Sequence, residues 1–210
     1  MKINNIKICA ILLCIGLSIW GCDKRSLTAL EYIRWVEDER NGLIVSKVIE
    51  DFIFTVQYKP LNYVALKSLR NVNPGKEELS KEVEEIEDMQ YYTLRIGTNS
   101  GARDLLKAGI ESEDEYFMRI EYFSFHIQKD LQLIDGPETL PCVLHHFERT
   151  YGIAPHSNIV LAFKLPEHTT AESRLKDKTL IYDDQVLGTG KIQLTIKEED
   201  LKMIPHLVTN

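Results

Sequence analysis

Short runs that alternate apolar and polar residues dominate the chain from residue 45 onward. Within the segment 45–58, one face of an extended chain collects Phe52, Phe54, Val56 and Tyr58, which is the pattern of a half-buried strand. Similar patterns predict further strands at 91–96, 116–128, 131–134, 142–149, 158–165, 179–182 and 191–196. Turn residues separate these segments. We therefore predict a mainly β fold, sandwich-like and antiparallel, with α+β as the second choice.

The segment 76–90 departs from this alternation and has the spacing of an amphipathic helix. Leu79, Val83 and Ile86 recur every three or four residues, while seven acidic residues occupy positions 77–88. We expect the apolar stripe to pack on the domain and the acids to face water. Shorter elements are expected at 27–42, 63–66 and 198–204, and a long polar loop at 166–178.

The first residues follow a third pattern. Lys2 and Lys7 precede an uncharged apolar run from Ile8 to Trp20. As a helix this run spans about 20 Å, too short for the ~30 Å hydrocarbon core of a bilayer. A basic start, an apolar middle and a small residue are typical of a secretory signal. We predict that residues 1–21 are removed, that 22–28 form a short tether, and that 29–210 fold as a single domain.

The end of this run, Ile19-Trp20-Gly21-Cys22, resembles the bacterial lipobox, although Trp20 stands where a small or hydroxylated residue is usual. With the acidic, β-rich domain that follows, the chain is similar to uncharacterised envelope lipoproteins of the Bacteroidota. The resemblance implies that Cys22 carries a lipid and that the protein is anchored to the outer membrane. Its periplasmic face is favoured, because only Asp23 matches the acidic cluster of surface-exposed members. The alternative is an ordinary secretory signal with an incidental cysteine.

Net charge limits the classes of ligand, and the cysteine count limits the thiol chemistry. Removal of residues 1–21 takes away two lysines and moves the formal net charge from −7 to −9. The mature chain lacks a basic stripe, which argues against nucleic acid as a ligand. Cys9 and Cys14 leave with the signal, so Cys142 is the only thiol besides the lipidated one. Its apolar neighbours predict a buried, inert side chain.

The cluster around His145 is the most suggestive for chemistry. If 142–149 is a strand, His146 and Glu148 share one face, and with His156 they could be imagined as a zinc site. The helical spacing of zinc enzymes is missing, so we interpret the histidines as hydrogen-bonded strand residues and predict neither a metal nor a cofactor. The segment 183–190, Asp-Asp followed later by Gly-Thr-Gly, indicates a hairpin turn.

Aromatic pairs provide a different type of candidate, and Tyr122 is the first choice for a binding surface. The preferred function is a non-catalytic binding or assembly component of the envelope, held to the membrane by its lipid and contacting another envelope protein. One alternative is a periplasmic hydrolase acting on glycan or peptide through His146 and Glu148. The other is an immunity or inhibitor protein whose acidic helix at 76–90 masks a basic toxin surface.

Overall fold

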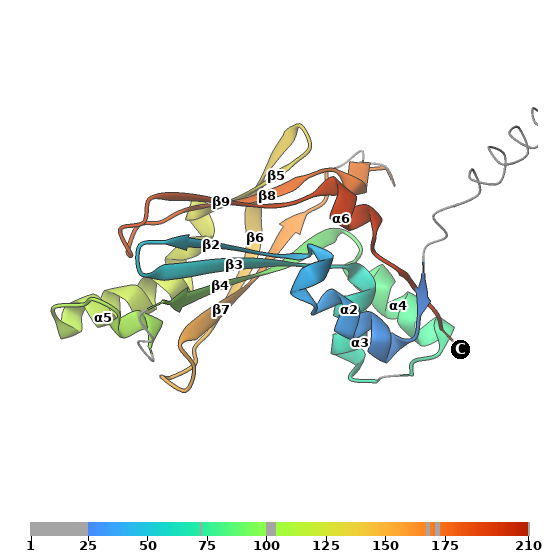
Figure 1. Ribbon diagram of the computed structural model, residues 1–210, viewed down its shortest axis with the longest axis horizontal. Coiled ribbons are helices and arrows are strands. Elements are labelled where there is room, and N and C mark those ends of the chain that lie inside the picture. The colour runs from blue at the N-terminus through green and yellow to red at the C-terminus, as the bar shows by residue number, and fades with distance from the viewer. Residues whose placement is uncertain (1–24, 72, 100–103, 167–168, 171–172, 210) are drawn as a thin grey trace, which may run out of the picture.

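A strongly curled antiparallel sheet forms the body of the protein (Figure 1). The computed structural model describes residues 25–71, 73–99, 104–166, 169–170 and 173–209; the predicted signal, Cys22 and Asp23 lie outside them. The strands run in the order β2-β3-β4-β7-β6-β5-β8-β9, and the edge strands β2 and β9 approach each other. Their bounds are β2 Ile44–Ile49, β3 Phe52–Lys59, β4 Met89–Thr98, β5 Leu131–Asp135, β6 Glu138–Glu148, β7 His156–Lys164, β8 Lys178–Asp183 and β9 Lys191–Ile196. The predicted mainly β, antiparallel fold is confirmed.

Alternation along the strands decides which side chains fill the curled sheet. On β3, Phe54 and Val56 are fully buried, and on β4 the same holds for Leu94 and Ile96. Facing strands add the other members of one continuous core: Leu131, Leu133, Ile159, Leu161, Phe163, Leu180, Tyr182, Ile192, Leu194 and Ile196. Each such side chain contributes about 1.5–3 kcal/mol by leaving water. The opposite, outer face of the sheet is then free to carry polar residues.

Three helices gather at one end of the curled sheet (Figure 1): α2 (Ala29–Val36), α3 (Leu61–Leu69) and α4 (Lys76–Ile86). The predicted acidic helix is confirmed as α4, with Leu79 buried, although it ends four residues earlier than expected. A short α6 (Glu198–Lys202) completes the helical layer near the carboxyl end. Within the described part of the chain, none of the helices combines the length and apolar character needed to cross a bilayer.

Strand pairing begins within the segment 22–28 that the sequence predicts as a tether. Strand β1 (Ser26–Leu27) pairs in parallel with β10 (His206–Leu207), and backbone bonds of 3.0 and 2.8 Å join Arg25 to His206 and Leu27 to Val208. Thr28 then caps α2, because its backbone and hydroxyl both donate to the Glu31 carboxylate.

Two strand predictions need correction. The segment 45–58 is extended as expected, with Phe54 and Val56 on the buried face, but it forms the hairpin of β2 and β3 because Glu50 takes a left-handed conformation (φ 53°) and reverses the chain. The segment 116–128 is helical: α5 (Glu113–Glu121) runs into a π-turn (Tyr122–His126) and a 3₁₀ turn (Ile127–Asp130). Ser112 caps this helix by accepting from the Glu115 backbone at 3.2 Å, and the acidic first turn suits the helix dipole.

A charged pair lies inside the sheet. Lys178 donates to Asp135 at 2.6 Å, and both side chains are almost fully buried. Gln90 donates to the other Asp135 oxygen at 2.7 Å and accepts from the Tyr92 hydroxyl at 3.2 Å. The carboxylate thus has a partner on each oxygen, as a buried charge requires.

We predict that Lys178→Met lowers the free energy of unfolding by about 3–5 kcal/mol, because it leaves the Asp135 carboxylate buried without its counter-charge. The matched double variant Asp135→Leu, Lys178→Met removes both charges and should recover most of the loss. Urea unfolding measures both. A single variant as stable as the double would contradict this account.

The 183–190 turn is confirmed as a hairpin connection built on Asp184. Its carboxylate accepts from the backbones of Val186, Leu187 and Thr189 and from the hydroxyls of Thr189 and Tyr182, at 2.8–3.1 Å. Burial alone would raise the pKa of Asp184, but these hydrogen bonds outweigh burial and hold the pKa below its usual value of 3.8.

The lowered pKa of Asp184 predicts an acid-sensitive contribution to stability. The unfolded chain binds this proton more readily, so the contribution is present above pH about 4 and is lost as pH falls through the lower, folded-state pKa. Asp184→Asn should cost about 1–2 kcal/mol at neutral pH, with the gap to the unmodified protein closing in acid. Thermal unfolding over a pH series measures it, and a pH-independent gap would contradict it.

Candidate functional site

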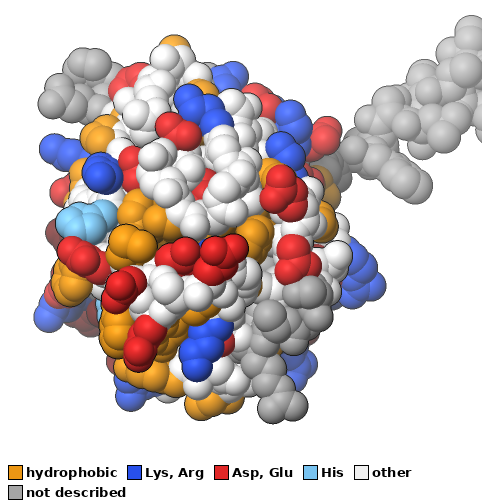
Figure 2. All heavy atoms as spheres, turned by 90° about the vertical axis from the view of Figure 1, so that its left-hand side faces the viewer, with side chains coloured by type: hydrophobic (Ala, Val, Ile, Leu, Met, Phe, Trp, Pro, Cys, Tyr) orange, Lys and Arg blue, Asp and Glu red, His pale blue; other side chains and the backbone are white. Residues whose placement is uncertain are grey.

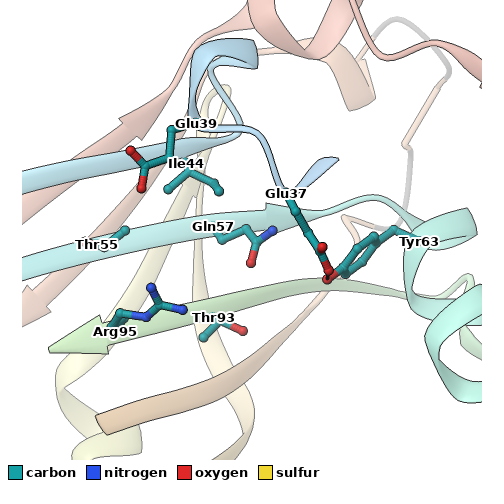
Figure 3. A pocket seen from close by; sticks show the side chains of 8 residues that line it. All are labelled: Glu37, Glu39, Ile44, Thr55, Gln57, Tyr63, Thr93 and Arg95. Atoms are coloured by element: carbon teal, nitrogen blue, oxygen red, sulfur yellow. Dashed lines mark hydrogen bonds between the residues drawn. The ribbon is translucent and has the colours of Figure 1, made fainter. Parts of the chain in front are cut away.

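A cleft of about 320 Å³ lies on the outer face of the sheet, between strands β2 to β4 and the helical end (Figure 3). The strands form its floor, and α3 and the turn after α2 form its walls. The lining residues are Glu37, Glu39, Ile44, Thr55, Gln57, Tyr63, Thr93 and Arg95. The floor is flat and polar because these strands turn their apolar side chains to the core.

Strand register brings the floor residues together. Gln57 lies opposite Thr93, and Thr55 lies opposite Arg95, on adjacent strands. Thr93 is only 8% exposed, and its hydroxyl makes no hydrogen bond with any residue that the structure describes. A buried polar group without a partner costs about 1–3 kcal/mol. In Figure 3 this side chain lies on the floor of the cleft, where its hydroxyl oxygen is almost wholly closed off from solvent.

The charges of the cleft differ in how far they are already paired. Glu37 accepts from the Tyr63 hydroxyl at 2.8 Å and from Lys67 at 3.2 Å, while burial and this carboxylate raise the pKa of Tyr63. Among the described residues, Glu39 has no side-chain partner. Arg95 uses Nε to donate to Asn158 at 3.2 Å, and its terminal nitrogens extend along the floor (Figure 3). One carboxylate and one guanidinium edge remain available.

The turn that carries Glu39 is rigid. This 3₁₀ turn, η1 (Glu39–Asn41), begins at Asp38, which accepts from the Arg40 backbone and side chain. The Arg40 hydrogen bonds lower the pKa of Asp38 to about 2. The turn ends at Gly42, whose positive φ of 75° and contact with the Asp200 side chain leave no room for a Cβ. The wall of the cleft is therefore fixed against α6.

The predicted site residues His146 and Glu148 do share the outer face of β6, as expected from alternation. They lie outside the cleft, since β7 separates β6 from β4. Glu148 is nevertheless linked to it: Asn158 donates to Glu148 at 3.1 Å and accepts from Arg95. The result is a polar ladder across three strands. His146 is exposed at the side of that ladder.

His145 and Cys142, the other residues considered from the sequence, contribute to the fold. His145 points inward and its ring nitrogens contact the Gln128 side chain at 3.1 Å and the Ser124 carbonyl at 3.0 Å. Cys142 is buried, which raises the pKa of its thiol to about 11. Its burial agrees with the prediction of an inert side chain. Over the described residues, no group of three or more His, Cys, Asp and Glu side chains could hold a metal ion.

Tyr122 does not provide the surface that its sequence context suggested. It lies at the start of the π-turn rather than on a strand, and its ring is buried. Its hydroxyl donates to Asp130 at 2.8 Å. Burial raises the pKa of Tyr122, and the Asp130 contact adds to this. The side chain is part of the core beneath α5.

The residues of the cleft were not singled out from the sequence. A signal for half of them exists, because alternation places Thr55 and Gln57, and likewise Thr93 and Arg95, on the polar face of a strand. No local pattern marks Glu37, Glu39 or Tyr63. They reach the same cleft only through the packing of the helical end on the sheet.

Comparisons with known proteins identify no family. No protein-family model matches the chain, and no curated protein matches it in sequence. Among solved structures, it is similar to a protein of unknown function from Burkholderia pseudomallei K96243, with 12% identity, coverage of 84% of this chain and 92% of that chain, and a TM-score of 0.37. A similarity at this level carries no argument about function.

Proposed function

We propose that this protein is a lipid-anchored component of the bacterial cell envelope that works by binding rather than by catalysis, and that the outer cleft is its ligand site. The observation that carries the ligand site is the Thr93 hydroxyl, which is buried at the floor of the cleft without a partner among the described residues. Folding rarely leaves such a group unpaired unless something else satisfies it.

The charges of the cleft indicate the ligand class. Glu39 lies on the 3₁₀ turn after α2, and the Arg95 guanidinium lies on the β4 side of the floor, so the two charges stand apart with β3 between them (Figure 3). A small molecule that carries both an ammonium and a carboxylate, such as a dipeptide, would match this separation. Thr93 and Gln57 between them offer hydrogen bonds to its backbone. We therefore propose a zwitterionic ligand of dipeptide size.

The arrangement of the cleft favours binding over chemistry. Its lining includes no Ser, Cys or His side chain among the described residues. Glu37, the other carboxylate of the cleft, already accepts hydrogen bonds from Tyr63 and Lys67. The alternative hydrolase, with His146 and Glu148, has less support because both are exposed on the outer face and Glu148 is paired with Asn158. The hydrolase would be supported if the protein hydrolysed a glycan or peptide and the Glu148→Gln variant did not.

Substitutions in the floor provide the test of the ligand site. Amino acids, dipeptides and neutral sugars would be screened by ligand-observed NMR, and we expect dipeptides to bind. Arg95→Gln should weaken that binding at least about tenfold, because a charge-assisted hydrogen bond contributes about 1.5–3 kcal/mol. Arg34→Gln, an exposed arginine on α2, is the matched control and should bind normally.

Thr93→Val separates ligand binding from stability. Removing an unpaired buried hydroxyl should raise the free energy of unfolding of the ligand-free protein by about 1 kcal/mol, while dipeptide binding weakens. A variant that is less stable and binds normally would show that the hydroxyl serves the fold instead. If no ligand bound in the screen, or if Arg95→Gln bound dipeptides as well as the unmodified protein, the cleft would not be the ligand site.

The anchor is tested separately. In a bacterial host, Cys22→Ser should release the protein from the membrane fraction, because acyl chains contribute ~0.8 kcal/mol per buried methylene. Mass spectrometry of the unmodified protein should find the lipid on the new amino terminus. A variant that stays with the membrane, or a mature chain without lipid, would contradict the anchor and leave the cleft unaffected.

A further inference from the structure

Exposed apolar side chains gather at the end of the molecule opposite β1. Phe117 and Met118 lie on α5, Phe125 lies on the π-turn that follows, and Ile153 lies on the hairpin between β6 and β7. Phe125 is 72% exposed and Ile153 is 91% exposed. Figure 2 views this end and shows hydrophobic side chains gathered in its lower part, with acidic side chains beside them. We call these residues, with Tyr151, the distal patch.

The distal patch is held outward by contacts on its inner side. Arg119 on α5 donates to the Ala108 carbonyl at 2.6 Å, and Tyr122 donates to Asp130. These hydrogen bonds hold the orientation of α5 about its own axis. Phe123 is fully buried and stacks on Phe147. The π-turn after α5 carries both the buried Phe123 and the exposed Phe125. Such turns are frequent at functional positions.

The hairpin belongs to the same surface as α5. Arg149 at the end of β6 donates to the Tyr116 hydroxyl of α5 at 3.2 Å. The guanidinium of Arg149 also stacks on the Tyr151 ring, 4.6 Å from its centre. The helix and the hairpin tip are therefore joined through Arg149, and both carry exposed apolar side chains at the same end of the molecule.

Charge decides which occupant fits. Exposed carboxylates border the patch at Glu111, Glu113, Asp114 and Glu121. The nearby cations Lys107, Arg119 and Arg149 already contact the Tyr116 ring, the Ala108 carbonyl and the Tyr151 ring, so the acidic charge is in excess. Two copies of this chain meeting face to face would bring like charges together, which is unfavourable. A partner with an apolar centre and a basic rim would meet both features of the surface.

We propose that the distal patch is a docking surface for an envelope protein that presents a basic, amphipathic segment. Figure 1 places α5 at one end of the curled sheet and β1 at the other. On a chain anchored at its amino end, the patch faces away from the bilayer and toward partners. The acidic helix α4 lies at the β1 end, which makes it the poorer docking surface for such a partner. This inference does not depend on the outer cleft.

The first test uses a defined probe. A helical peptide built from Leu and Lys is titrated into the purified domain, with a matched peptide of Leu and Glu as its control. We expect only the basic peptide to bind, with affinity that falls as salt rises. The double variant Phe117→Ser, Phe125→Ser should weaken it at least tenfold. Met203→Ser, at a methionine as exposed as Met118 but near β10, should leave it unchanged.

The second test uses the native envelope. A photo-crosslinking phenylalanine at position 125 should join the chain to a protein whose crosslinked peptide is basic and apolar, and one at position 203 should not. An adduct of two copies of this chain, or an adduct with lipid, would overturn the proposal. So would a basic peptide that binds the double variant and the unmodified domain equally. Circular dichroism confirms that the variants are folded, since the substituted side chains are exposed.

Discussion

The register between β3, β4 and β7 is the constraint on which the surface of this protein depends. Because Tyr92 and Leu94 must enter the core, Thr93 and Arg95 must point outward, and their neighbours on β3 follow. A slip by one residue would exchange the two faces along the whole strand. The apolar interior therefore fixes the position of the polar cleft on the opposite face of these strands.

The interior itself is not uniformly apolar. Asp135, Lys178 and Gln90 form a buried polar group whose members come from three different strands. Such a pair adds little stability compared with well-packed apolar side chains. It does require β5 and β8 to meet in one register, since any shift would separate the two charges. We regard it as a device that selects the correct pairing of the second half of the sheet.

Periodicity in the sequence predicts the strands well where one face is buried. The strands at 91–96, 131–134, 142–149, 158–165, 179–182 and 191–196 are all found, and so is the acidic helix α4. The two corrections have different causes, since the segment 45–58 is divided by a left-handed turn at Glu50 and the segment 116–128 is helical. Around residue 120, β-branched and aromatic residues favour a strand locally, yet the Ser112 cap and the acids after it favour a helix, and packing of Tyr116, Ile120 and Phe123 decides for the helix.

Sites are harder to predict than strands, because they join distant segments. Alternation correctly placed His146 and Glu148 on one face, but only the strand order shows that Asn158 connects Glu148 to Arg95. Tyr122 was chosen for its aromatic neighbours, and its burial follows from a helix that those neighbours did not indicate. Glu39 reaches the cleft because a 3₁₀ turn after α2 folds over β2, which no local pattern records.

The glycine that ends that turn connects the cleft to the rest of the molecule. Gly42 lies directly against Asp200 of α6, and α6 leads into β10, the strand that holds β1. A side chain at position 42 would therefore press on Asp200. The resulting displacement of α6 would reach both the cleft wall that bears Glu39 and the pairing of β10 with β1.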